Sequence, residues 1–303
     1  MTWRNPLSGV SPDHDALMPN DPPLGWAARS EGDHLAQIEH RIETAGEQPD
    51  YSGREFSPAE IEAGAHRAFI GGIWDTHGER QLEYLKRQGL QPHHRLLDIG
   101  CGPFRAGRHF IDYLDPGNYF AVDANHSLIQ AGYDVELSDE QRDRLPTSNL
   151  RANDRFDVDF GVPFDFAIAQ SVFTHVSLNH VRLCLYRLAP AMREGGEFYA
   201  TVFVRPRSTP VDAIIPSKRG KPFLNEKNVF WHYSEDLRWA SEVGPWRYTF
   251  VGDWGHPANQ KMAKFVRVTP EPATPPRPVP TGRVAKSVYR GRRWMARHLD
   301  PTG

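Results

Sequence analysis

The 303-residue sequence predicts an α/β fold in which helices cover both faces of a doubly wound, mostly parallel β-sheet. From residue 95 onward, short apolar runs alternate with segments of helical pattern, which is typical of parallel strands joined by right-handed crossovers. The first of these runs ends in a glycine turn. The last two runs are separated by a turn rather than a helix, which predicts an antiparallel pair at the sheet edge.

Two helices are expected before the first strand. The sequence Ser57-Pro58-Ala59-Glu60 has the pattern of a capping box with proline in the first turn, and it predicts a helix through about Phe69. Residues 76–79 repeat the signal before the segment 81–88, which predicts a second helix that ends at Gly89.

The remaining elements follow in chain order. Seven strands are expected at residues 95–99, 119–123, 150–154, 166–169, 197–204, 246–251 and 262–268. Helices are expected at 106–114, after residue 123 and at 177–192. In such sheets, ligands bind beyond the carboxyl ends of the strands, where the direction of winding reverses. The chemistry of the protein is therefore expected at that edge.

The composition excludes several classes of protein. Hydrophobic residues make up 39% and charged residues 24%, which is enough apolar material for a buried core. A net charge of −2 argues against nucleic-acid binding by the whole surface. Two cysteines are too few for a disulfide framework, and no apolar run approaches the ~18 residues of a membrane span. No secretory signal is visible at the start, so we expect a soluble, cytoplasmic protein.

Charge and proline content divide the chain into three parts. Residues 1–53 are expected to be an acidic, flexible arm, since residues 1–50 hold nine acidic and three basic side chains. The folded unit is placed at 54–268, with 205–233 as a cover over the substrate. Residues 269–303 are expected to be a proline-rich linker and a basic tail, because 271–303 hold seven basic and two acidic side chains.

The strongest chemical signal is the segment Leu96-Leu97-Asp98-Ile99-Gly100-Cys101-Gly102-Pro103. Glycines after a buried strand let the backbone approach a ligand closely, and the following helix points free amides at the same place. Asp123 ends the second strand and suits a carboxylate that binds ribose hydroxyls. A nicotinamide-dependent oxidoreductase is the alternative, but an NAD site usually has a third glycine where Arg105 stands, which argues against it. An ordinary turn between a strand and a helix, with no ligand, is the other alternative.

Four segments resemble the class I S-adenosylmethionine-dependent methyltransferases. They are Leu97-Asp98-Ile99-Gly100-Cys101-Gly102, Val122-Asp123, Asn153-Asp154 and the run from Phe164 to His175. The resemblance covers roughly residues 75–268 and implies a Rossmann-like, seven-stranded sheet with an antiparallel edge strand. It also implies S-adenosyl-L-methionine as the cofactor and a methyltransferase activity. Phe104 departs from the pattern, since many members have another glycine there.

The resemblance also implies roles for individual residues. Gly100 and Gly102 would pass the methionyl and ribose portions of the cofactor, with Asp98 toward its ammonium group and Cys101 as a small apolar filler between the glycines. Asp123 would bind the ribose, and Asn153 with Asp154 the adenine, Asp157 being the alternative to Asp154. The expected contacts of the methionyl end are Gln170, at the mouth of the fourth strand, and Trp74, for which core packing is the alternative.

Methyl transfer needs in-line alignment, and an oxygen or nitrogen acceptor also needs a general base. His175 is the first candidate because it follows the fourth strand, although a structural role is the alternative. His232 and His256 are the other catalytic candidates, both in segments expected to cover the sheet edge. Arg105 is expected to be a solvated cation at a helix start. No compact cluster of metal ligands is visible, so no metal is expected.

The methyl acceptor is expected to be a small molecule, with a hydroxyl of a sugar or a lipid-linked glycan as the leading hypothesis. The signals are the basic tail and a set of aromatic residues in the expected cover, namely Phe223, Phe230, Trp231, Tyr233 and Trp254. The basic and aromatic stretch 283–298 favours contact with the inner membrane surface over RNA, a solvated tail being the bland alternative. A non-catalytic S-adenosylmethionine-binding partner protein is a further alternative. The sequence does not predict the oligomeric state.

Overall fold

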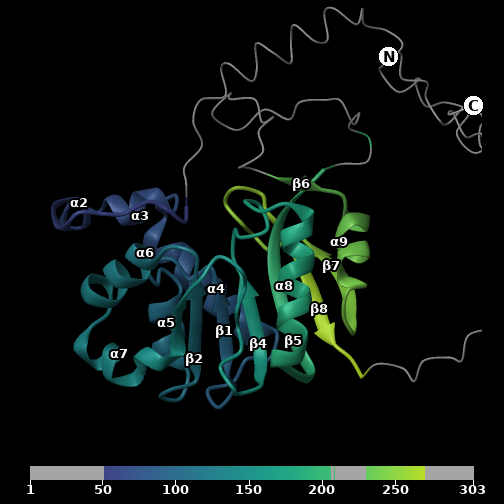
Figure 1. Ribbon diagram of the computed structural model, residues 1–303, viewed down its shortest axis with the longest axis horizontal. Coiled ribbons are helices and arrows are strands. Elements are labelled where there is room, and N and C mark those ends of the chain that lie inside the picture. The colour runs from purple at the N-terminus through teal and green to yellow at the C-terminus, as the bar shows by residue number, and fades with distance from the viewer. Residues whose placement is uncertain (1–50, 206–207, 209–229, 270–303) are drawn as a thin grey trace, which may run out of the picture. The chain divides into compact units, whose positions relative to one another are not determined.

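A mixed β-sheet is the centre of the computed structural model, which describes residues 51–205, 208 and 230–269 (Figure 1). Within these residues the strand order is β3-β2-β1-β4-β5-β8-β7, and β6 pairs with β5. The strands are β1 (Leu96–Ile99), β2 (Tyr119–Asp123), β3 (Leu150–Ala152), β4 (Phe164–Ala169), β5 (Met192–Val204), β6 (Trp231–His232), β7 (Trp246–Gly252) and β8 (Lys261–Arg267). The predicted fold class is confirmed, with β6 as an additional short strand.

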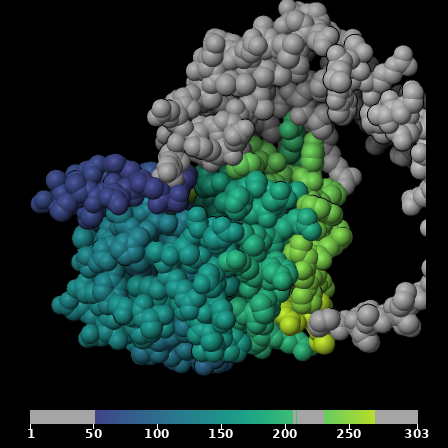
Figure 2. Space-filling view, in the orientation of Figure 1, coloured from purple at the N-terminus to yellow at the C-terminus, as the bar shows by residue number. Residues whose placement is uncertain are grey.

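The helices connect these strands or precede them. They are α2 (Pro58–Glu62), α3 (Ala65–Phe69), α4 (Trp74–Arg87), α5 (Gly107–Tyr113), α6 (His126–Ala131), the π-helix η3 (Gly132–Glu136), α7 (Asp139–Arg144), the 3-10 helix η4 (Thr147–Asn149), α8 (Leu178–Ala191) and α9 (Ser234–Ser241). Figure 2 shows the first part of the described chain, in purple, along one side of the domain.

The sheet reverses its winding between β1 and β4. Both strands are parallel neighbours, with Asp98 opposite Ile168, whereas the chain goes outward from β1 to β2 and β3 on one side and from β4 to β5 on the other. Beyond β5 the pairing with β8, and of β8 with β7, is antiparallel, as predicted. The carboxyl ends of β1 and β4 therefore meet at the switch point, where ligands of such sheets bind.

Two apolar cores cover the two faces of the sheet. On one face, buried side chains of β1, β4 and β5 pack with Cys184, Leu185 and Leu188 of α8 and with Leu237 of α9. On the other face, alternate residues of the same strands pack with α4, α5 and α6. This alternation is the period of two that a strand buried on both faces requires.

The N-terminal helices differ in detail from the sequence expectation. The capping box at Ser57 is present, but the helix is interrupted at Gly64, whose φ of 76° ends the α-helical geometry, so that α2 and α3 are separate. The second helix begins at Trp74 rather than after a cap at Thr76. Its N-cap is Ile73, which has φ 51°, a strained value for a β-branched side chain.

Candidate functional site

The glycine loop after β1 bends tightly back against β2. The amides of Gly100 and Cys101 both donate to the carbonyl oxygen of Val122, at 2.7 and 3.2 Å. Gly100 has φ 77° and Gly102 has φ 53°, conformations that side chains rarely adopt. A Cβ atom at Gly100 would also lie 2.3 Å from Cγ2 of Val172, which follows β4. Only glycine therefore fits at position 100.

Phe104 takes the place of an expected glycine in this loop and keeps glycine-like backbone geometry. Its φ is 59°, and its ring is completely buried. Two other glycines make room for the ring. A Cβ at Gly107 would lie 2.8 Å from Phe104 Cδ1, and a Cβ at Gly132 would lie 2.6 Å from its Cδ2. The aromatic side chain is thus accommodated by Gly107 and Gly132, which no local motif predicted.

Asp123 joins the carboxyl ends of β1 and β2. Its Oδ2 accepts the amide hydrogen of Gly102 at 2.8 Å, and its Oδ1 accepts that of Asn125 at 2.8 Å. Burial raises the pKa of this carboxyl, although the backbone amides oppose the shift. Because each carboxylate oxygen has more than one acceptor site, Asp123 can still accept hydrogen bonds from two neighbouring hydroxyl groups.

Asp98 lies buried in β1 beneath the glycine loop. The Tyr119 hydroxyl donates to its Oδ2 at 2.8 Å. Burial raises the pKa of Asp98 to about 7, and the charge of Asp123 adds to the shift, whereas the Tyr119 hydrogen bond and the Arg105 charge oppose it. A ligand cation beside this carboxyl would stabilise its ionised form.

Arg105 does not have the solvated position that the sequence suggested. Its side chain is partly buried, and Nη1 donates to the carbonyl oxygens of Ile70 and Gly72 at 3.1 and 2.8 Å. Burial lowers the pKa of the guanidinium to about 10. The prediction failed because the acceptors are carbonyls of the segment between α3 and α4, far away in the sequence. Arg105 therefore ties that segment to the glycine loop.

The segment before α2 also contacts the carboxyl edge of the sheet. The Asn125 amide donates to the carbonyl oxygens of Tyr51 and Arg54 at 2.8 and 2.7 Å. The amide of Phe56 donates to the Ser127 hydroxyl at 3.1 Å. These contacts begin at Tyr51, within the region assigned to the N-terminal arm by composition.

Trp74 stands at the start of α4 between two cations. The guanidinium carbons of Arg67 and Arg108 lie 4.9 and 5.5 Å from its ring centroid, and the His66 ring packs edge-on at 6.4 Å. His66 Nε2 and the Arg67 guanidinium both contact the carboxylate of Glu136, which is itself buried. This arrangement surrounds Trp74 with α3, α5 and η3, and its role toward a cofactor stays a prediction.

The residues after β3 form a local turn. Asn153 donates its backbone amide to the Asp123 carbonyl at 2.9 Å. Its side-chain oxygen accepts the amides of Arg155 and Asp157, at 3.2 and 2.8 Å. Asp154 is exposed, and Asp157 lies 3.3 Å from Arg151 in an ion pair. Asn153 is thus held beside the end of β2, next to Asp123.

Gln170 belongs to a cluster of polar side chains on the other side of the switch point. We call this set the Gln170 cluster; its members are Gln170, Ser171, Thr201, His256 and Gln260. Gln170 Nε2 lies 3.0 Å from Ser171 Oγ and 2.9 Å from His256 Nε2. Ser171 has φ 62°, and its amide donates to Thr201 Oγ1. The Oε1 atom of Gln170 is buried without a hydrogen-bond partner among the described residues.

The three histidines proposed for catalysis lie in different surroundings. The His175 ring is 4.7 Å from the Tyr51 ring, at the rim formed with the segment before α2. His232 is buried in β6 with Nε2 3.2 Å from the Phe173 carbonyl oxygen, and burial lowers its pKa. His256 joins the Gln170 cluster. The structure therefore does not bring the three together.

His77 is a neighbour of the site that the sequence did not single out. Its buried ring packs edge-on against His256 at 4.7 Å and lies 6.0 Å from Trp254. Burial lowers the pKa of His77 to about 3, and the charge of Arg105 acts in the same direction. His77 lies in the segment 76–79, which the sequence pattern predicts to be a helix cap, so no motif indicated a role in the site.

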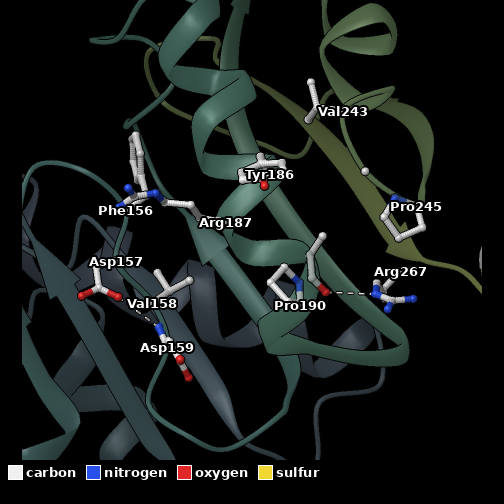
Figure 3. Close-up of a pocket in the computed structure, with 12 residues that line it drawn as sticks. Phe156, Asp157, Val158, Asp159, Tyr186, Arg187, Pro190, Val243, Pro245 and Arg267 are labelled. Carbon is white, nitrogen blue, oxygen red and sulfur yellow. Dashed lines mark hydrogen bonds between the residues drawn. The ribbon is translucent and has the colours of Figure 1, made fainter.

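A cavity of about 490 Å³ lies away from this edge, between the loop after β3, the last turns of α8 and the loop before β7 (Figure 3). Arg267 lines this cavity, and its Nε donates to the Ala189 carbonyl at 2.9 Å. Of the residues proposed for the site, the cavity is lined by Asp157, the alternative adenine contact. This cavity therefore does not coincide with the switch point.

In the part of the chain that the structure describes, no group of three or more His, Cys, Asp or Glu side chains could hold a metal ion. No helix of the same part is long and apolar enough to cross a membrane. Much of the expected cover, including Phe223, and the basic tail lie outside the described residues.

Known proteins share this architecture. Residues 97–198 match a family model described as a methyltransferase domain. Human N-acetylserotonin methyltransferase in complex with SAM is 13% identical, with a TM-score of 0.51, over 80% of this chain and 69% of that one. An S-adenosylmethionine-dependent methyltransferase from Clostridium acetobutylicum is 12% identical, with a TM-score of 0.50, over 71% of this chain and 100% of that one. At these identities the two structures show a common fold.

Proposed function

We propose that the chain is a class I S-adenosylmethionine-dependent methyltransferase and that it methylates a hydroxyl group of a small molecule, namely a sugar or a lipid-linked glycan. The family is the one that the motifs predicted, and it sets aside the nicotinamide-dependent alternative. The acceptor rests on one observation, the aromatic rings that flank both sides of the switch point.

The residues at the ends of β1 and β2 fit the cofactor. Gly100 and Gly102 have backbone geometry that brings the loop close to a ligand, and Asp123 presents a carboxylate fixed by two amides. Asp98 is a buried carboxyl that a ligand ammonium group would keep ionised. In our proposal Asp123 binds the ribose hydroxyls, and Asn153 with Asp154 binds the adenine edge.

Aromatic side chains support an acceptor with flat or apolar faces. Rings stand on both sides of the cofactor-binding residues, as they do in many sites that bind small molecules. One group, at the rim, contains Tyr51, Phe69 and His175. The other contains His256 and, packed against it, the buried rings of His77 and Trp254. The C–H faces of a sugar ring and the isoprenoid part of a lipid carrier both suit the rim group.

The chemistry requires alignment and removal of one proton. Bound S-adenosylmethionine supplies a methyl group on an already activated sulfonium. The protein has to exclude water and hold the acceptor hydroxyl in line with that methyl group. We assign the proton of the hydroxyl to His175, because it follows β4 and its ring stands at the rim, 4.7 Å from the Tyr51 ring.

The test is transfer of a labelled methyl group. The full chain is incubated with methyl-labelled S-adenosylmethionine and either a cell-envelope extract or a soluble extract, and label and S-adenosylhomocysteine are both measured. We expect label in a glycan or lipid-linked fraction. His175→Ala should lower the rate by about a hundredfold without changing S-adenosylhomocysteine affinity, whereas His180→Ala should change neither. Label confined to protein or nucleic acid would reject the proposed acceptor.

A further inference from the structure

We propose that His256 is a positioning residue rather than a base. Its Nε2–H donates to the carboxamide oxygen of Gln170, and this turns the Gln170 NH2 group toward a carboxylate oxygen of the bound S-adenosyl ligand. The proposal deepens the proposed function, since it rests on the same cofactor. It also removes His256 from the set of residues that could accept the proton of the substrate.

The hydrogen bonds of the His256 ring fix its tautomer. Nδ1 accepts the backbone amide hydrogen of Ala258 at 3.0 Å, so Nδ1 cannot carry a proton itself. A neutral imidazole has one N–H group, which is then on Nε2. A ring with this tautomer offers a donor, not an acceptor, toward Gln170.

The orientation of the Gln170 carboxamide follows from that tautomer. The two ends of a carboxamide have nearly the same shape, and hydrogen bonding decides which is the oxygen. With Nε2 of Gln170 at 2.9 Å from His256 Nε2, two donors would face each other. A half-turn about the last side-chain bond brings the Gln170 oxygen to His256 instead.

The remaining hydrogen bonds of the Gln170 cluster are compatible with this half-turn. Thr201 Oγ1 accepts the Ser171 amide at 2.7 Å and donates to Gln260 Oε1 at 2.6 Å. Gln260 Nε2 donates to Ser171 Oγ at 2.9 Å. The Ser171 hydroxyl then donates to the Gln170 oxygen, 3.0 Å away, instead of to Gln260 Oε1, 3.1 Å away, which keeps the Thr201 hydroxyl as its donor. The half-turn also replaces the long 3.4 Å hydrogen bond from Gln170 to Gln260 Oε1 with two oxygens at that distance.

The half-turn leaves the NH2 group of Gln170 in need of an acceptor. The end of the carboxamide that it occupies is buried without a partner among the described residues, and only 8% of Gln170 is exposed. Buried donors are nearly always hydrogen-bonded, so a bound molecule is expected to supply the acceptor. Asp98 pairs with Ile168, so Gln170 follows β4 at the level where Gly100 follows β1. This is the methionyl side of the cofactor-binding residues.

The first experiment reads the tautomer directly. Long-range proton–nitrogen NMR spectra of histidine-labelled protein distinguish the two neutral forms and the protonated ring. We expect His256, assigned by the loss of its signals in His256→Gln, to have its proton on Nε2. His94 is an internal reference, because its Nδ1 also accepts a backbone amide, that of Gln91, at 3.0 Å. A proton on Nδ1 of His256, or a doubly protonated ring at neutral pH, would overturn the proposal.

The second experiment measures affinity for S-adenosylhomocysteine by calorimetry. His256→Gln keeps an N–H donor and should bind within about threefold of the wild type, whereas His256→Leu should bind roughly tenfold more weakly, as loss of orientation of a hydrogen bond to a carboxylate predicts. His94→Leu is the matched control, and equal thermal unfolding of the leucine variants shows that both fold. Unchanged affinity in His256→Leu would reject the positioning role. Failure of the wild type to bind would instead reject the cofactor assignment, and the NMR result would stand.

Discussion

The two sides of the switch point present different chemistry to the same edge of the sheet. On the β1–β2 side, the carboxylates of Asp98 and Asp123 hold a hydroxyl and two backbone amides. On the β4–β5 side, the polar groups are carboxamides, hydroxyls and an imidazole, all in the Gln170 cluster. In our proposal, the first side binds cationic and hydroxyl groups of the ligand, and the second, which is neutral, binds its ligand through the direction of hydrogen bonds.

The largest effect on stability is expected at Gly100, where the loop after β1 packs against Val172 after β4. Gly100→Ala should destabilise the protein by about 3 kcal/mol, because φ is positive and the added Cβ would overlap Val172 Cγ2. Gly117→Ala is the matched control, since Gly117 has φ 83° with nothing within 4 Å of the added Cβ, and it should cost about 1 kcal/mol. Chemical denaturation measures both.

Adding Val172→Ala to Gly100→Ala should recover part of that loss, because it removes the overlapping atom. No recovery in the double variant would show that backbone strain alone makes position 100 a glycine.

Asp123→Ala tests the charged side. It should weaken S-adenosylhomocysteine binding by about a hundredfold, because it removes the acceptor for ribose and leaves the amides of Gly102 and Asn125 without their partner. Calorimetry measures the change, and Asp139→Ala is the control, as an exposed aspartate paired only with a neighbour on α7. Equal affinity in the two variants would contradict the assignment of the cofactor site.

Asp98 should make the unliganded protein less stable as the pH rises. Its folded-state pKa of about 7 is above the ordinary value of 3.8, so its contribution is fully present below pH 4 and is lost as the pH rises through 7. Asp98→Asn should abolish this slope in denaturation curves recorded from pH 4 to 8. A ligand ammonium group beside Asp98 favours the ionised carboxylate over the protonated form. The affinity for S-adenosylhomocysteine should therefore increase from pH 4 to 8 in the wild type, and not in Asp98→Asn.

His77, on the other side, should give a pH dependence of opposite sign. Its pKa is lowered to about 3 from 6.5, so its contribution is present above pH 6.5 and is lost progressively as the pH falls toward 3. His77→Gln should therefore flatten the acid side of the stability curve. If the Asp98 and His77 variants changed the pH dependence of the free energy of unfolding in the same direction, the proposed difference between the two sides of the switch point would be wrong.

Deletion of the basic tail should have the smallest effect on cofactor binding of all these changes. Deleting residues 271–303 removes seven basic and two acidic side chains, and we expect the shortened chain to sediment less with anionic vesicles. Its affinity for S-adenosylhomocysteine should equal that of the full chain. Unchanged sedimentation would dismiss membrane attachment, and a loss of cofactor affinity would place the tail within the binding function.

The sequence predicted where the residues of the charged side lie in the fold, because its signals are local; their binding roles stay predictions. The strand, the glycines and the carboxylate at Asp123 follow one another within a short stretch, and the spacing carries the chemistry. The neutral side could not be predicted in the same way. Gln170 and Gln260 are 90 residues apart, and His77 reaches His256 from a different helix. Such contacts depend on how the elements pack, so single residues gave no warning of them.

Some errors arose from reading a single position by its usual preference. Arg105 is expected to be a solvated cation, but its Nη1 donates to the carbonyls of Ile70 and Gly72, which are distant in the sequence. The second helix is expected to begin with a side-chain cap, whereas it begins at Trp74 without one. In the case of Arg105, long-range partners outweigh the local signal.

The ring of Phe104 is one of several groups that keep Gly107 and Gly132 small. A Cβ at position 107 would also lie 2.6 Å from the Tyr119 hydroxyl, and a Cβ at position 132 would also lie 2.6 Å from the Pro103 backbone. A smaller residue in place of Phe104 would therefore leave a void that larger residues at these two positions could not fill.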